Sequence, residues 1–117
     1  MQYLLLLYSD ETRWPAMPPA EQEAAMVEYG AYHQALTKAG VLLGSNRLQP
    51  TSATTVVRVD AGRTQVLDGP YAEAKEQLGG YFLIDVPDLD AAITWAARCP
   101  GAQHGVVEVR PVWSSER

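Results

Sequence analysis

The sequence predicts an α+β domain in which an antiparallel sheet carries two helices on one face. Residues 3–8 are an unbroken apolar run and residues 81–86 are strongly apolar, and both are typical of strands buried on both faces. Two longer segments with helix start and stop signals, residues 20–39 and 89–99, separate the strands. The resulting order is strand, helix, three strands, helix, strand (βαβββαβ). At 117 residues, the chain is expected to form one domain over residues 1–117.

The first helix is marked by proline at its start and glycine at its end. Pro18 and Pro19 suit the first helical positions, and Gly40 stands at the expected stop. Residues 9–19 before it are expected to form a loop. His33 falls on the apolar stripe of this helix, so we expect it to face inward. The other large members of that stripe are Met26, Tyr29 and Leu36.

A β-hairpin is predicted in the middle of the chain. Residues 41–48 have an apolar start and contain a glycine, which indicates a connection. Residues 54–60 and 63–67 are rich in β-formers, and Ala61-Gly62 joins them tightly. Residues 72–77 are compatible with one or two helical turns.

A rigid turn follows the hairpin at Asp68-Gly69-Pro70. Gly69 tolerates positive φ, and Pro70 fixes its own φ while keeping Gly69 out of the α region. The turn therefore holds the Asp68 carboxylate in a defined place. Gly79 and Gly80, further on, are expected where another backbone passes close by.

The last third of the chain contains a helix and a strand. Asp88 is the expected N-cap of the second helix, and Pro100-Gly101 stops it. Residues 106–112 alternate Val, Glu, Val, Arg and form the last strand, and residues 114–117 are expected to be a tail.

The helices are too few to cover the predicted sheet. Both doubly apolar strands need cover on two faces, while two helices cover only one. An exposed sheet face of this kind would exceed the few hundred Å² of contiguous apolar surface that monomers tolerate. We therefore predict a two-fold symmetric homodimer packed through its sheets.

Charge and cysteine content exclude several classes of function. The net charge of −5 argues against nucleic acid or an anionic membrane as partner, because both need a basic surface. The single cysteine, Cys99, excludes an internal disulfide and suits the reducing cytoplasm. No apolar run approaches the ~20 residues of a membrane span. No cofactor is expected, and no metal, since His33, Asp68 and His104 lack ligand spacing.

The stretch from Asp68 to Tyr81 resembles the signature of the DGPF-domain proteins within the YCII-related superfamily. The matching residues are Asp68-Gly69-Pro70-Tyr71, Glu73, Lys75-Glu76 and Leu78-Gly79-Gly80-Tyr81. Tyr71 stands where the family name implies phenylalanine. Further similarities, such as Tyr32-His33 and Val107-Glu108-Val109-Arg110-Pro111, extend over nearly the whole chain.

This resemblance implies a ferredoxin-like fold that dimerises into an α/β barrel. It also implies small enzymes with a His–Asp pair in a cleft, of which at least one removes chloride from a chlorinated hydroxyquinol. DGPF proteins are often encoded beside, or fused to, extracytoplasmic-function sigma factors. Carried onto this sequence, the pair falls on His33 and Asp68.

A His33–Asp68 pair would suit acid–base chemistry. A carboxylate on one imidazole nitrogen fixes the tautomer and leaves the other nitrogen as general base or acid. The structural alternatives are a core histidine whose hydrogen bonds are all made within the protein, and an aspartate that only stabilises its own turn.

Four further residues are candidates for ligand binding, and three of them have a purely structural alternative. Tyr71 and Tyr81 could point a hydroxyl at a ligand, although buried tyrosine is commonly core. Arg47 could bind a carboxylate, although a lone loop arginine is usually surface. Ser9 follows the first strand, where it could face a cleft.

The first hypothesis is therefore a small cytoplasmic homodimer with a cleft for a small organic ligand, in which His33 and Asp68 abstract a proton or promote elimination. The alternative is a non-catalytic sensor or partner module for a sigma factor. A third is a dimeric scaffold.

Overall fold

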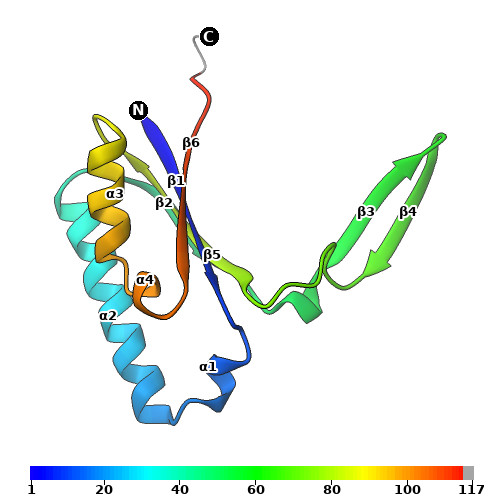
Figure 1. Ribbon diagram of the computed structural model, residues 1–117, viewed down its shortest axis with the longest axis horizontal. Helices are drawn as coiled ribbons and strands as arrows, with labels where there is room; N and C mark the ends of the chain where they lie inside the picture. The colour runs from blue at the N-terminus through cyan, green and yellow to red at the C-terminus, as the bar shows by residue number, and fades with distance from the viewer. Residues whose placement is uncertain (115–117) are drawn as a thin grey trace.

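The computed structural model describes residues 1–114, so the last three residues of the expected tail lie outside the described part. A four-stranded antiparallel sheet forms the body of the molecule, in the order β2-β5-β1-β6. Its strands are β1 (Gln2–Ser9), β2 (Leu42–Arg47), β5 (Gln77–Asp85) and β6 (Val106–Pro111). The two long helices, α2 (Pro19–Lys38) and α3 (Leu89–Arg98), lie together on one face (Figure 1). The predicted α+β class is confirmed, and the arrangement is compatible with a ferredoxin-like fold.

The hydrophobic core lies between the sheet and the two helices. The Tyr32 ring of α2 packs edge-on against Phe82 of β5, with centroids 5.1 Å apart. Its hydroxyl donates a hydrogen bond of 2.7 Å to the Trp95 carbonyl oxygen of α3. This one side chain therefore joins both helices to the sheet. The buried residues of the core are Tyr3, Leu5, Tyr32, Leu36, Phe82, Ile84, Val86, Ala92, Ala96 and Cys99.

Helix α2 begins and ends where the sequence predicts, but it is rotated relative to the predicted stripe. Pro19 is its first residue, and Gly40 beyond its end has φ of +74°. The buried residues of α2 are Tyr32 and Leu36, while Met26 is 51% exposed and His33 is exposed. The prediction that His33 faces inward is thus wrong. Tyr32 and Leu36 are four apart and share a face, so their burial turns the adjacent His33 outward.

Residues 41–48 form strand β2 rather than the predicted connection. The strand lies at the sheet edge and pairs with β5, with a register shift between Leu42 and Gly44. Only its start is apolar, so it lacks the alternation by which a strand is recognised. The close approach predicted at the two glycines occurs at Gly80, where a Cβ would lie 3.0 Å from the Asn46 carbonyl oxygen.

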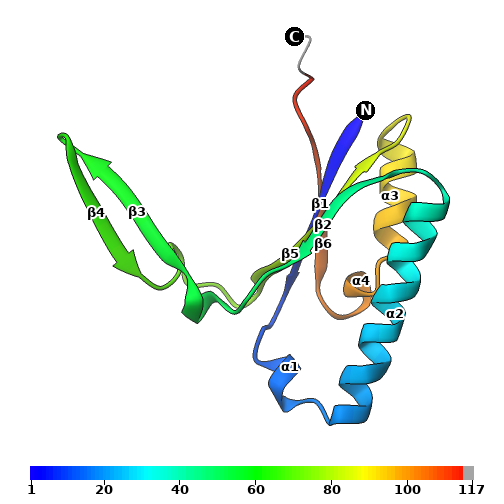
Figure 2. The ribbon, with the colours of Figure 1, turned by 180° about the vertical axis from the view of Figure 1, so that it is seen from behind.

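The predicted hairpin exists but lies outside the main sheet. Strands β3 (Thr55–Asp60) and β4 (Arg63–Asp68) form a separate two-stranded sheet, joined by Ala61 and Gly62, which both have positive φ. The 3-10 turn η1 (Thr51–Ala53) precedes it. The prediction of a single sheet is wrong here because β2 takes the position beside β5. The hairpin projects from the side of the sheet opposite the helices (Figures 1 and 2).

Short elements complete the chain. Asp88 caps α3 as predicted, accepting a hydrogen bond of 2.9 Å from the Ala91 amide. Two short helices, α1 (Arg13–Ala16) and α4 (Gly101–His104), occupy segments expected as loops. Residues 72–76 contain no helical turn, and β5 already begins at Gln77. None of the helices in residues 1–114 is long and apolar enough to cross a membrane.

The molecule is extended for its size. Its accessible surface is 8433 Å², whereas a compact monomer of 12.8 kDa exposes about 6,300 Å². Its radius of gyration is 16.4 Å, against about 13 Å for a compact domain of this length. The projecting hairpin and the bare side of the sheet account for this shape (Figure 1).

Candidate functional site

The side of the four-stranded sheet opposite the helices has no covering element among the described residues. We call it the open sheet face. Side chains alternate along a strand, so the neighbours of the core residues point to this face. The residues of the open sheet face used below are Leu4, Leu6, Tyr8, Asn46, Tyr81, Leu83, Glu108 and Arg110.

Strand register arranges these side chains in rows across the sheet. One row runs from Asn46 through Tyr81 and Leu6 to Glu108. Leu83, Leu4 and Arg110 form the next row. The open sheet face is therefore an apolar strip with polar side chains along both edges.

Each edge carries a polar pair. The Asn46 Nδ2 donates a hydrogen bond of 2.8 Å to the Tyr81 hydroxyl oxygen. That oxygen accepts, so its own proton remains to be donated. At the other edge, Arg110 Nη2 lies 2.6 Å from Glu108 Oε1. Both partners of that ion pair are substantially exposed, so it adds little stability.

The structure does not bring His33 and Asp68 together. His33 is exposed on α2, in the helical layer. Asp68 is the exposed last residue of β4, on the hairpin that leaves the other side of the sheet (Figure 1). No hydrogen bond joins their side chains among the described residues.

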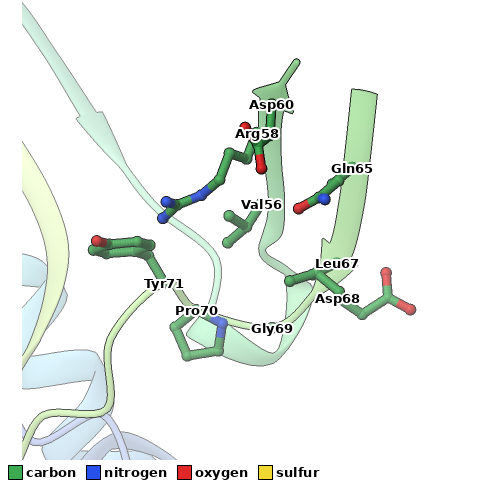
Figure 3. Close-up of a pocket in the computed structure, with 9 residues that line it drawn as sticks. All are labelled: Val56, Arg58, Asp60, Gln65, Leu67, Asp68, Gly69, Pro70 and Tyr71. Atoms are coloured by element: carbon green, nitrogen blue, oxygen red, sulfur yellow. The ribbon is translucent and has the colours of Figure 1, made fainter. Parts of the chain in front are cut away.

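Tyr71 and Asp68 border a shallow concavity of about 530 Å³ on the hairpin. The Arg58 guanidinium lies over the Tyr71 ring, 5.7 Å from its centroid. Figure 3 shows Tyr71 and Arg58 turned toward each other above Pro70, while the Asp68 carboxylate points away from them. Tyr71 is 77% exposed, so this concavity is open to solvent.

Arg47 and Ser9 lie at one end of the sheet without forming a site together. The Arg47 guanidinium lies 4.5 Å from the centroid of the Trp14 ring, a cation–π contact that links β2 to α1. Ser9 packs against Gly105, where an added Cβ would lie 3.0 Å from the Ser9 Cβ. Of the predicted ligand-binding residues, Tyr81 therefore has the most suitable surroundings.

The perturbed titrating groups lie away from the open sheet face. Burial raises the pKa of Tyr29 to about 12, and it also raises the pKa of Tyr32 and of the Cys99 thiol. Hydrogen bonds from Thr12 lower the pKa of Asp10. Within residues 1–114, no group of three or more His, Cys, Asp or Glu side chains could hold a metal ion.

Asn46 is the site residue that the sequence analysis misses. The sequence of β2 predicts a connection rather than a strand, so the place of Asn46 beside Tyr81 does not follow from it. By contrast, the alternation that predicts β6 also indicates that Glu108 and Arg110 share one face.

The fold and its open sheet face define a class: small α+β proteins whose four-stranded antiparallel sheet is covered by helices on one side only. The chain belongs to the YCII-related family, since the family model of the YCII-related domain matches residues 1–116. The resemblance to the YCII-related superfamily that the sequence indicates is thereby confirmed. The chain is also 41% identical over 114 residues to an uncharacterized protein of Rhizobium meliloti (strain 1021), covering 96% of this chain and 92% of that protein.

Proposed function

We propose that the chain acts in the cytoplasm as a homodimer that binds a small organic molecule on its open sheet face. The dimer has the barrel-like packing, sheet against sheet, that the family resemblance implies. The molecule it binds is largely apolar and carries a hydrogen-bond acceptor.

Surface area supports the dimer. One subunit exposes roughly 2,000 Å² more than a compact monomer of its mass. Obligate homodimer interfaces bury about 2,000–5,000 Å² in total. The open sheet face carries the half-buried Leu4, Tyr81 and Leu83 and has no covering element among the described residues, so a second sheet is the natural partner for it.

The arrangement around Tyr81 carries the ligand proposal. Binding sites for small molecules are mostly apolar with a few placed polar groups. Here Leu6 lies beside Tyr81 on one strand and Asn46 on the other. The bond from Asn46 orients the phenol, which leaves its proton available to a ligand acceptor.

The test is a thermal-shift screen of small organic compounds against wild type and the Tyr81→Phe variant. A ligand at ~100 times its dissociation constant should stabilise wild type by about 2.7 kcal/mol. Losing one hydrogen bond of roughly 1 kcal/mol should weaken binding about fivefold in Tyr81→Phe. Sedimentation of the wild type tests the dimer in parallel.

Tyr29→Phe is the matched control, because Tyr29 lies on the helical side and belongs to no polar pair of the open sheet face. It should keep the wild-type affinity. His33→Ala should also keep it, since His33 lies on the helical layer. Equal affinities in wild type and Tyr81→Phe would contradict the proposed site.

A further inference from the structure

The β3–β4 hairpin has no support from its own subunit along its length. Val56 is half-buried, and every other residue in the two strands is exposed. An isolated two-stranded hairpin is marginally stable at best in water. A hairpin held this far from the body therefore indicates a partner that covers it.

One face of the hairpin carries exposed apolar side chains. Cross-strand register places Val57 opposite Val66 and Val59 opposite Thr64 on the same face. The three valines are 61%, 60% and 66% exposed, in the order Val57, Val66, Val59. We call these three valines the apolar arm face.

The charged side chains of the hairpin mostly avoid this face. Arg58, Asp60 and Arg63 fall on the opposite face by alternation, together with Val56 and Leu67 nearer the base. Asp68 is the one charged strand residue on the valine face, and it lies at the base, opposite Thr55. Strands that alternate in this way usually bury the apolar side and solvate the other.

The base of the hairpin is fixed to the body. The Glu11 carboxylate accepts a 3.0 Å hydrogen bond from the Thr51 amide and a second from the Thr51 hydroxyl. The Gly69 amide donates to the Thr54 carbonyl oxygen at 2.7 Å, which closes the base of the hairpin. An arm held in one direction loses little further freedom on binding.

We propose that the apolar arm face docks on a second copy of this chain, so that each subunit of the dimer clasps the other with its hairpin. The inference rests on the homodimer proposed above. The hairpin projects on the same side as the open sheet face (Figures 1 and 2), so a partner resting against the sheet also meets the arm. The extra exposed area and the large radius of gyration are those of a subunit taken from such a dimer.

A second copy fits better than an unrelated partner because one two-fold axis satisfies both surfaces. The same chain carries the uncovered arm and the uncovered sheet, and two-fold symmetry pairs each with the other molecule. The ligand site then gains its cover from the partner.

The experiment compares Val59→Asp with Val27→Asp by sedimentation equilibrium of the purified chain. Val59 on the arm is 66% exposed and Val27 on α2 is 68% exposed. The two variants therefore differ in the position of the substituted residue and not in its exposure. A buried hot-spot residue lost from an interface weakens it at least ~30-fold. We expect this loss in the dimerisation of Val59→Asp and wild-type dimerisation in Val27→Asp.

Failure of the two proposals can be told apart. A dimeric wild type with an equally dimeric Val59→Asp overturns the arm and leaves the sheet-packed dimer standing. A monomeric wild type overturns both.

A second measurement covers the case in which Val59→Asp unfolds the arm. A photo-crosslinking residue replaces Val66 in one protein and Val27 in another. Covalent dimers should form from position 66 and be absent from position 27. Equal yields from both positions would overturn the arm docking.

Discussion

Tyr29 and Tyr32 lie one turn apart on α2, yet their hydroxyl groups have different surroundings. Tyr32 donates to the Trp95 carbonyl oxygen at 2.7 Å, and the residue is 5% exposed. No hydrogen bond is made by the Tyr29 hydroxyl within residues 1–114. A hydroxyl–carbonyl bond in the core contributes about 1 kcal/mol, and its loss leaves the acceptor unsatisfied.

Tyr32→Phe should therefore lower the free energy of unfolding by about 1 kcal/mol and Tm by about 4 °C. Tyr29→Phe should change neither. Urea unfolding at one fixed chain concentration measures both, since the stability of the proposed dimer depends on concentration. Equal losses in the two variants would show that the bond to Trp95 is not the cause.

Alkaline pH should destabilise the fold through the same two side chains. Burial raises the pKa of Tyr29 from its ordinary 10.0 to about 12, and it raises the pKa of Tyr32 as well. Above pH 10 the unfolded chain releases phenol protons that the folded chain retains. This contribution to stability is therefore complete below pH 10 and is lost as the pH rises toward about 12.

The measurement is the free energy of unfolding of wild type and Tyr29→Phe at several pH values in that window. Wild type should lose stability with rising pH, and the variant should lose it less steeply. Parallel curves would contradict the assignment to Tyr29.

His33 and Tyr32 show what sequence periodicity can and cannot predict for single residues. The helix and its ends follow from Pro19 and Gly40, because both residues act locally. Which neighbour faces inward depends on the partner surface. The Tyr32 ring fits edge-on against Phe82, a contact between residues fifty positions apart that no local pattern encodes.

At the scale of elements, the joint between the body and the hairpin depends on the loop after β1. The Glu11 amide donates to the Gln77 side-chain oxygen at 2.9 Å, and the Glu11 carboxylate accepts from Thr51. One residue thus ties the end of β1 to the start of β5 and to the turn before β3.

Glu11→Ala should loosen the hairpin while leaving the body folded. The Thr51 amide loses its acceptor, so its hydrogen exchange should quicken, and the free energy of unfolding should fall by about 1 kcal/mol. Glu23→Ala, an exposed glutamate on α2, is the control and should show neither effect. Unchanged exchange at Thr51 would mean that Glu11 does not hold the joint.

Among the elements, one reason explains why the sequence predicts neither strand β2 nor the separate sheet of the hairpin. Edge strands bury little, so β2 needs no run of apolar residues, and its Gly44, Ser45 and Asn46 are typical of a loop. The hairpin has the stronger β pattern because its valines need cover. Strand propensity indicates that a segment suits a partly buried strand, but it does not say against which surface the strand packs.

At the scale of the whole molecule, the sequence predicts the uncovered sheet better than it predicts the site. The uncovered sheet face is predicted because two helices can cover only one side of strands that are apolar on both sides. That comparison needs only the types of the residues. The position of Tyr81 beside Asn46 depends on β2 pairing with β5, and the separation of His33 from Asp68 depends on where the hairpin points. Both are consequences of topology rather than of local sequence.

The sheet order also governs how the chain matures during synthesis. β1 is translated early, yet it lies in the middle of the sheet, and its two neighbours are β5 and β6. Strand β5 must therefore leave the ribosome before the leucine-rich first strand finds its first partner, and β6 must follow before it finds the second. Until then the nascent chain carries an apolar β-segment without a partner strand, a feature that favours aggregation while the chain is incomplete.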